Sequence, residues 1–360
     1  MKNIHHYKMQ QVIITKDIQK ELSQFLFEHH YDKIFVLADT HTYNLCFPVI
    51  RPLPAIEQAT LIVIAPGDTN KNLEQLTTVW QALSKNGASR NSLLINLGGG
   101  MITDLGGFAG ATFKRGIDTL NIPTTLMASV DAAVGGKTGI NFYGLKNEIG
   151  AFHIPVCVLI DCVFLQTLDR ANLLSGYAEM IKHGLIHSET ILNKLFAFDL
   201  DSKELNINII NELVKESIAV KEQIVNEDPK EKGIRKALNL GHTIGHAFES
   251  LSFEKQKPIL HGHAVAAGLV SELYLSHKSC GFPVETLRRT VNFIKSCYPP
   301  FLFVCDDYEA LYELMKHDKK NESGIINFTL LVQTGDIRIN QSIDKESIFD
   351  SLDFYRETCL

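Results

Sequence analysis

The chain has 360 residues, of which 45% are hydrophobic and 21% charged, and its formal net charge is -6. At about 150 residues per domain this length predicts two domains, and the net negative charge argues against a nucleic-acid-binding protein that depends on bulk positive charge. The longest apolar runs are far shorter than the roughly 20 residues that span a bilayer, and the N-terminus lacks the apolar core of a secretion signal. Seven scattered cysteines without a Cys-x-x-Cys pair fit a reducing compartment. We therefore expect a cytoplasmic protein that binds neither membranes nor nucleic acids.

The first half of the sequence alternates short apolar runs with amphipathic segments. Five runs rich in Val, Ile and Leu are predicted to be buried strands, at residues 33–38, 60–65, 92–97, 119–122 and 156–160. Helical periodicity lies between them, at residues 17–29, 72–85 and 103–113. This alternation predicts an α/β domain, residues 1–169, with a Rossmann-like parallel sheet covered by helices on both faces.

From about Asp169 long helical segments follow one another. They are predicted at residues 170–186, 203–226, 236–252, 263–278, 284–296 and 307–317. A hairpin is expected between residues 325–332 and 337–339, around a turn at Gly335 and Asp336. The highly charged stretch 221–236 contains Pro229 and Gly233 and predicts a loop. Residues 170–360 are therefore expected to form a mainly helical domain.

Three glycines, Gly98 to Gly100, directly follow a predicted strand and precede a predicted helix. Glycine lets the backbone approach a ligand closely, and a helix N-terminus offers N–H groups to a phosphate. The Gly-x-Gly-x-x-Gly fingerprint is absent, so a tight strand–helix turn is the alternative to a nucleotide site. Asp39 ends an earlier strand and either binds a ribose hydroxyl or caps a helix.

A second glycine-rich segment, residues 130–141, is followed by Lys146 and Asn147. Its Gly135-Gly136-Lys137-Thr138 sequence resembles a phosphate-binding P-loop only loosely, because the P-loop spacing is missing. Bare backbone beside two lysines and an amide nevertheless predicts an anion-binding cradle. The alternative is a solvated loop.

Carboxylate and imidazole groups recur in the helical half. Glu179, Lys182 and His183 share one face of a predicted helix, a pattern that is also typical of a surface salt bridge. His242 and His246 have the spacing with which two imidazoles bind one metal, with buried core histidines as the alternative. His261 precedes an apolar helix and is well placed as a further ligand. Two histidines and a carboxylate leave positions open for substrate, which is the pattern of a catalytic zinc site.

Six motifs in this order resemble those of the 3-dehydroquinate synthase family of sugar-phosphate cyclases: GGGMITDLGGFAGATFKRG, IPTTLMASVDAAVGGKTGIN, LKNEIGAF, GYAEMIKHG, LNLGHTIGHAFE and LHGHAVAAG. The resemblance runs from about Gly67 to Val332. It implies an N-terminal NAD-binding α/β domain, a C-terminal helical domain, an active site in the cleft between them, and a homodimer.

The resemblance also implies roles for individual residues. The metal, Zn2+ or Co2+, would be bound by Glu179, His242 and His261. Contacts to NAD would come from Asp39, Asp68, Lys71, Gly99, Gly100, Asp104, Thr124, Thr125, Asp131, Lys146, Thr167 and Leu168. The small-molecule sugar phosphate would be bound by Lys137, Asn147, Lys182, Lys221, Arg235, Asn239, His246 and Lys319. Arg115 would reach the phosphate in the neighbouring subunit's site.

Three positions depart from the family's pattern. Asp68 stands where the family usually has Glu, and Asn172 occupies a position near the cofactor that is commonly Glu. His263 replaces the Glu of the usual His-Gly-Glu sequence and is a further candidate metal ligand.

The implied reaction converts 3-deoxy-D-arabino-heptulosonate 7-phosphate into 3-dehydroquinate and phosphate. It is a lyase reaction with transient oxidation by NAD, phosphate β-elimination, re-reduction, ring opening and aldol closure. A metal-dependent NAD polyol or alcohol dehydrogenase is one alternative, but such an enzyme needs no phosphate cradle around Val134–Asn141. A cyclase with another substrate and an inactive regulatory protein are the others.

Overall fold

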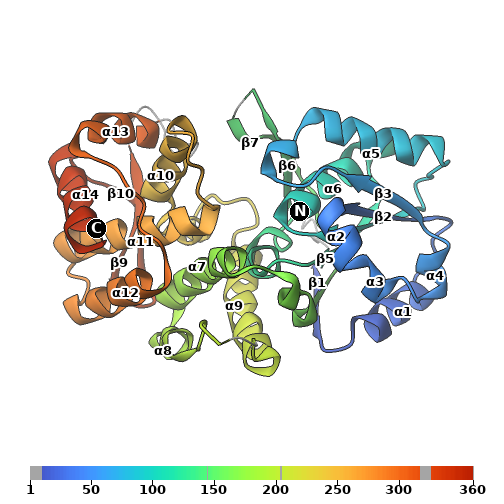
Figure 1. The fold of residues 1–360 in the computed structure, drawn as a ribbon, viewed down its shortest axis with the longest axis horizontal. Helices are drawn as coiled ribbons and strands as arrows, with labels where there is room; N and C mark the ends of the chain where they lie inside the picture. Colours follow the sequence, from blue (N-terminus) through green and yellow to red (C-terminus); the bar gives the residue numbers. More distant parts are fainter. Residues whose placement is uncertain (1–9, 144, 203–204, 317–325, 360) are drawn as a thin grey trace, which may run out of the picture. The chain divides into compact units, whose positions relative to one another are not determined.

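The computed structural model describes residues 10–143, 145–202, 205–316 and 326–359. The chain forms two compact units, whose elements are labelled in Figure 1. The first unit comprises the chain up to Asp169 together with Asn206–Lys215. The second comprises Arg170–Leu205 and the chain from Glu216 onward.

A six-stranded parallel sheet forms the centre of the first unit, with the strand order β1-β8-β5-β4-β2-β3. Its strands are β1 (Gln11–Thr15), β2 (Ile34–Asp39), β3 (Thr60–Ile64), β4 (Leu93–Gly98), β5 (Asp118–Pro123) and β8 (Cys157–Asp161). The five predicted strands are confirmed. The additional strand β1 pairs with β8 at one edge of the sheet.

Helices cover both faces of this sheet, as Figure 1 shows. They are α1 (Ile18–Glu28), α2 (Thr40–Leu45), α3 (Phe47–Ile50), α4 (Pro54–Glu57), α5 (Leu73–Lys85) and α6 (Gly100–Thr112). Val36 and Ile95 face a core that includes Leu22 of α1, whereas their neighbours Leu37 and Leu94 face the core built on α5 and α6. Successive strand residues point to opposite faces, and both faces are buried, which explains the continuous apolar runs. The predicted α/β class is confirmed.

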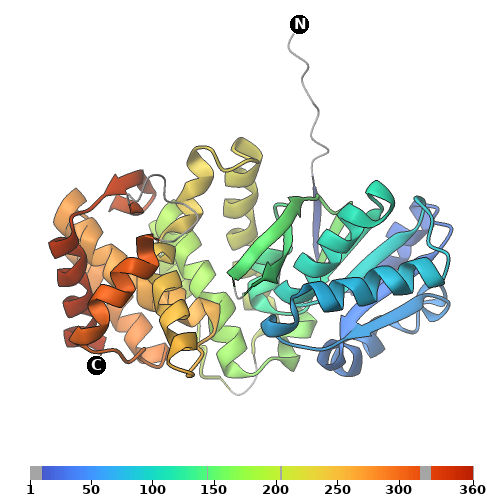
Figure 2. The same cartoon turned by 90° about the horizontal axis from the view of Figure 1, so that it is seen from above.

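The second glycine-rich segment forms an antiparallel hairpin of β6 (Lys137–Phe142) and β7 (Leu145–Phe152). The hairpin packs against α6, as Figure 2 shows. A Cβ on Gly107 of α6 would lie 2.4 Å from Thr138 Cγ2, so only glycine permits this approach. Residues 137–142 and 145–152 are therefore strands rather than the loop that was the alternative prediction.

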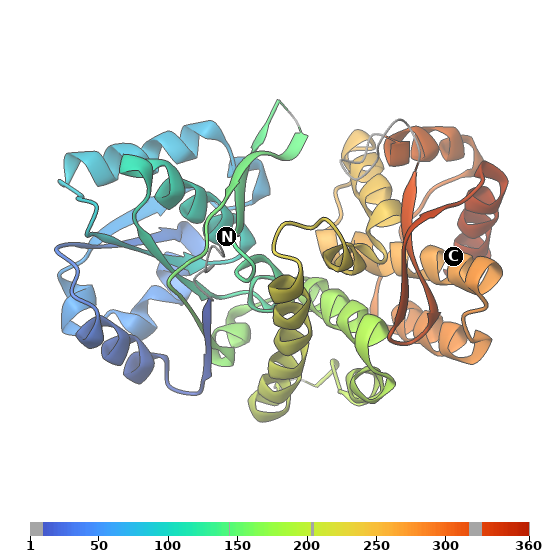
Figure 3. The same ribbon diagram turned by 180° about the vertical axis from the view of Figure 1, so that it is seen from behind.

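The second unit is mainly helical, as predicted. Its helices are α7 (Arg170–His187), α8 (Glu189–Ala197), α10 (His242–Glu254), α11 (His261–Cys280), α12 (Val284–Cys297), α13 (Tyr308–Lys316) and α14 (Lys345–Cys359). The predicted hairpin is formed by β9 (Asn327–Gln333) and β10 (Asp336–Ser342), and β9 packs on α11 (Figure 3). Within the described residues, no helix combines the length and the apolar character needed to cross a membrane.

The charged stretch 221–236 differs from its prediction. The first part of this stretch is helical and belongs to α9 (Ile207–Glu227), because Val220 and Ile224 are buried and continue the helical periodicity. A 3-10 helix, η5 (Ile234–Asn239), follows the short loop. Gly241, with φ at +78°, then separates η5 from α10, so the helix predicted over residues 236–252 is in fact two elements.

Candidate active site

Glu179 lies in the middle of α7 with its side chain fully buried. Its Oε2 accepts a hydrogen bond from Lys182 Nζ, one turn later on the same helix. Its Oε1 is buried and accepts no hydrogen bond from the described residues. Burial raises the pKa of Glu179, but the charges of Lys182 and His242 outweigh it and hold that pKa well below its ordinary value. Glu179 is therefore an ionised carboxylate with one oxygen available to a cation.

Two imidazoles face this oxygen. His242 Nε2 lies 3.4 Å from Glu179 Oε1, and His261 Nε2 lies 3.6 Å from it. His242 is the first residue of α10 and His261 the first of α11, so two helix starts meet the middle of α7. One carboxylate oxygen and two imidazole nitrogens are a donor set suited to Zn2+ or Co2+. Glu179 Oε1 is buried and accepts no hydrogen bond from the described residues, which fits a cation bound at this place.

His246, one turn after His242 on α10, belongs to the same cluster. Its ring centroid lies 5.3 Å from that of His242 and 5.6 Å from that of His261. One nitrogen from each of the three rings lies within 4.8 Å of the other two. This geometry suits both a metal ligand and a neighbour of the substrate phosphate.

His261 has carboxylates on both sides. Burial lowers the pKa of His261, but the charges of Glu249 and Glu179 outweigh it and raise that pKa to about 10. Without a metal the imidazole is therefore protonated at neutral pH. A metal that binds Nε2 must displace this proton.

The basic side chains predicted to bind substrate in the second unit are buried. Lys182 is 1% exposed, Arg235 2% and Lys221 5%. Lysine and arginine are rarely buried to this extent, so three of them in one unit favour the binding of anionic groups.

The short loop after α9 fixes Arg235. Arg235 Nη1 donates to the Pro229 carbonyl at 2.9 Å, and its backbone N–H donates to Asp228 Oδ2 at 3.2 Å. Asn239 Nδ2 donates to Glu231 Oε1 of the same loop at 3.4 Å. Lys319, the remaining predicted substrate contact in this part of the sequence, lies outside the described residues.

Most residues predicted to contact NAD follow the carboxyl ends of parallel strands. These residues are Asp39 at the end of β2, Asp68 and Lys71 after β3, Gly99 and Gly100 after β4, Thr124 and Thr125 after β5, and Thr167 and Leu168 after β8. The carboxyl ends of parallel strands lie at one edge of a sheet, and open α/β sheets bind ligands there. The arrangement supports a cofactor site at this edge.

The glycine turn after β4 leaves no room for side chains. A Cβ on Gly99 would lie 2.9 Å from Thr125 Cγ2, and one on Gly100 would lie 3.2 Å from the Cβ of Ala132. Helix α6 begins at Gly100, three residues before the predicted start at Thr103. The first N–H groups of α6 are therefore preceded by glycines without side chains, so a phosphate could approach them closely.

A polar network joins the β6–β7 hairpin to the turn after β3. Buried Lys71 donates to Asp104 Oδ2 at 2.5 Å and also to Asn147 Oδ1 on β7. Lys146 Nζ lies 3.2 Å from Asp68 Oδ2. Predicted cofactor and substrate residues of the first unit are thus in direct contact. The side chains of Arg115 and Lys137 are exposed, and their roles stay predictions.

Comparison with known proteins decides the family. The N-terminal family model of 3-dehydroquinate synthase matches residues 61–175, and the C-terminal one matches residues 176–321. A 3-dehydroquinate synthase of Parabacteroides distasonis is 66% identical over 349 residues, which cover 97% of this chain and 98% of the relative. The chain belongs to the 3-dehydroquinate synthase family.

Solved structures share the fold of this 3-dehydroquinate synthase family member. A 2-epi-5-epi-valiolone synthase from Streptomyces hygroscopicus, with NAD+ and Zn2+ bound, has a TM-score of 0.86 at 22% identity over 97% of each chain. A 2-deoxy-scyllo-inosose synthase complexed with carbaglucose-6-phosphate, NAD+ and Co2+ has a TM-score of 0.80 at 20% identity over 96% of each chain.

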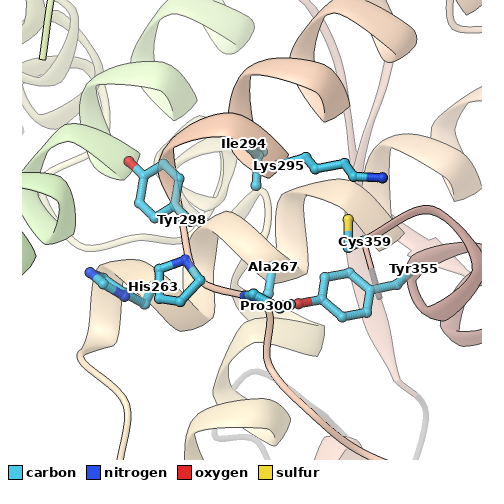
Figure 4. Close-up of a pocket in the computed structure, with 9 residues that line it drawn as sticks. His263, Ala267, Ile294, Lys295, Tyr298, Pro300, Tyr355 and Cys359 are labelled. Carbon is cyan, nitrogen blue, oxygen red and sulfur yellow. The ribbon is translucent and has the colours of Figure 1, made fainter. Parts of the chain in front are cut away.

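His263, which departs from the family's His-Gly-Glu sequence, does not join the histidine cluster. Its Nε2 lies 3.0 Å from the Ala171 carbonyl, and its ring meets Tyr298 edge-on at 5.5 Å. Figure 4 shows it lining a separate pocket with Lys295 and Tyr355. Two residues along a helix correspond to a rotation of about 200°, so His263 cannot face the same way as His261. The prediction of His263 as an additional ligand is wrong.

Asp39 caps α2, which was one of its two predicted roles. Its Oδ1 accepts hydrogen bonds from the backbone N–H groups of His41 at 2.8 Å and Thr42 at 2.9 Å. A contact to the ribose of NAD stays a prediction.

One residue at the cluster of this 3-dehydroquinate synthase family member was not predicted. Glu249 Oε2 lies 3.1 Å from His261 Nδ1. Glu249 follows His242 and His246 on one face of α10, at spacings of seven and three residues. This periodicity was visible in the sequence and could have identified it.

Proposed function

We propose that this protein is a 3-dehydroquinate synthase, which converts 3-deoxy-D-arabino-heptulosonate 7-phosphate into 3-dehydroquinate and phosphate. The observation that carries the proposal is 66% identity to a 3-dehydroquinate synthase across 97% of the chain. The reaction class is carbon–oxygen lyase, since phosphate leaves by β-elimination.

We infer that the protein uses NAD and a divalent ion, Zn2+ or Co2+. Cyclases of the same fold contain NAD+ with either ion. Residues 1–169 would bind NAD, and residues 170–360 would supply the metal ligands Glu179, His242 and His261. Such an ion acidifies a bound hydroxyl group, and NAD takes up and later returns a hydride.

The protein's own side chains would orient the substrate and stabilise its charges. Lys182, Lys221 and Arg235 are buried cations that would neutralise the phosphate and carboxylate while negative charge moves during elimination. Lys182 is held by Glu179, so its ammonium group is already in position before substrate binds. The predicted substrate contacts include no carboxylate, and the departing phosphate would accept the proton itself.

We also propose a cytoplasmic homodimer. All seven cysteines are free, as expected of a protein in a reducing compartment. Arg115 lies exposed in the turn after α6, where it is available to a second copy of the chain.

The proposed function is tested by incubating the protein with the heptulosonate phosphate, NAD and Zn2+, and measuring phosphate and 3-dehydroquinate together. We expect equal amounts of both products, and their loss after treatment with a chelator. A polyol dehydrogenase would instead form NADH from an alcohol without releasing phosphate, and that result would contradict the proposal.

A further inference from the structure

The two imidazoles that face Glu179 are held in different ways. His242 Nδ1 lies 3.0 Å from the backbone carbonyl of Leu240. His261 Nδ1 lies 3.1 Å from the carboxylate of Glu249. Both carbonyl and carboxylate oxygens accept hydrogen bonds only, so each Nδ1 donates and each Nε2 is left to face Glu179. One ligand therefore depends on the backbone and the other on a side chain.

Glu249 is only 4% exposed. A carboxylate is rarely buried unless charged or polar partners compensate for the lost hydration. Glu249 belongs to α10, which also carries His242 and His246, and it reaches His261 at the start of α11. It thus connects the helix of one candidate metal ligand to the ring of another.

We propose that Glu249 is a positioning residue, which orients the His261 ring and strengthens its bond to the divalent ion. The proposal rests on the proposed function, since it assumes that His261 binds a metal. A carboxylate on the outer nitrogen fixes the ring and increases electron donation from the inner one. Loss of such a partner typically lowers metal affinity by 10- to 100-fold.

The difference between the two histidines makes this proposal specific. The carbonyl that holds His242 belongs to the backbone, so no substitution removes it. The group that holds His261 can be removed by a single substitution at Glu249. We therefore expect Glu249 to affect metal affinity through His261.

The experiment measures the affinity of metal-free protein for Co2+ and Zn2+ against a chromophoric chelator, without turnover. We expect E249A to bind each ion 10- to 100-fold more weakly than the unsubstituted protein. E249Q should lose less, because its amide oxygen still accepts the hydrogen bond from Nδ1. Its bound Co2+ should show an altered visible spectrum, which a purely structural role would not produce.

Asp161 supplies the matched control. Its carboxylate is 5% exposed, lies in the other unit, and accepts hydrogen bonds from the backbone of Ile18 and Val163. We expect D161N to keep the affinity for both ions even if it is less stable. Circular dichroism and NAD binding establish that each variant is folded. If E249A does not fold, the comparison of E249Q with the unsubstituted protein tests the proposal.

A double-mutant cycle separates positioning from general destabilisation. With His261 replaced by Ala, the further change E249A should alter metal affinity less than twofold, because the ring on which Glu249 acts is gone. Unchanged affinity and an unchanged Co2+ spectrum in E249Q would overturn the proposal, as would an undiminished effect of E249A without His261. Failure of the unsubstituted protein to bind any divalent ion would overturn the proposed function instead.

Discussion

At the scale of single residues, the site depends on a carboxylate that stays ionised although it is completely buried. Glu179 achieves this because Lys182 neutralises one oxygen and two imidazoles face the other. Lys182 is itself only 1% exposed, so neither partner can be removed without leaving a buried charge. Burying such an ion pair contributes little to the stability of the fold, so its presence here is better explained by a binding site.

Substitution of His242 by Ala should remove the metal together with the activity. We expect metal affinity and turnover to fall by more than about 100-fold, because the substitution removes a metal ligand itself and not only a residue that orients a ligand. Metal content and product formation measure this. His263→Ala is the matched control, because His263 faces the Ala171 carbonyl instead of the cluster. Full turnover by H242A without metal would refute the assignment.

His153 should make the first unit sensitive to acid. Burial lowers the pKa of His153, and Asp118 opposes this only in part. The unfolded chain therefore takes up a proton as pH falls through about 6.5, while the folded chain resists it, and stability is lost below that pH. Melting curves at pH 7.5 and 5.5 should show a smaller loss for His153→Gln. An equal loss in both proteins would show that His153 does not contribute.

The residue types at the site could be predicted from the sequence. The directions in which some of their side chains point could not. Glu179, His242 and His261 were identified by motif, and the structure brings them together. His263 was named as a further ligand because it replaces the Glu of the usual His-Gly-Glu sequence, but residues two apart on a helix point in nearly opposite directions. Glu249 was overlooked because a glutamate in a helix is usually exposed.

At the scale of elements, the backbone of α11 packs closely on the backbones of α7 and of the turn before α10, with no room for a Cβ between them. A Cβ on Gly262 would lie 1.8 Å from the Ser175 carbonyl of α7, and one on Gly268 would lie 2.1 Å from the Gly241 carbonyl. Glu272 of α11 also accepts hydrogen bonds from the backbone of Gly241 at 2.6 Å and Ile244 at 2.9 Å. These contacts fix the starts of α10 and α11, where His242 and His261 lie.

Substitution of Gly262 by Ala should force α11 away from α7. Overpacking of this kind typically costs about 1–3 kcal/mol, and here it would also separate His261 from Glu179. We expect both the melting temperature and the metal affinity to fall.

Ala267→Gly on the same helix is the control for Gly262. It lowers helix propensity by about 1 kcal/mol without a collision, so it should reduce stability but keep the metal. If G262A bound metal as tightly as A267G, the close approach of α7 and α11 would not matter for the site.

Elements with a clear period were predictable and glycine-rich ones were not. The strands of the parallel sheet followed from continuous apolar runs, because both faces of that sheet are buried. Strands β6 and β7 contain glycines and exposed polar residues, such as Gly139, Gly150 and Lys137, and neither strand was predicted from the sequence. Pro229 and Gly233 marked the loop after α9, but the helix continues to Glu227.

At the scale of the whole molecule, each unit contains its own part of the proposed chemistry. The first unit places most of the predicted NAD contacts at the carboxyl edge of a parallel sheet. The second unit gathers the candidate metal ligands and the buried cations. An enzyme that oxidises its substrate and then reduces it again needs both functions in one turnover, and it regenerates NAD each time.

The most direct test is the amount of 3-dehydroquinate formed for each molecule of NAD supplied. We predict that product accumulates to many times the amount of NAD, while absorbance at about 340 nm shows no accumulation of NADH. Formation of one NADH for each substrate molecule, or product limited to the amount of NAD added, would contradict the account.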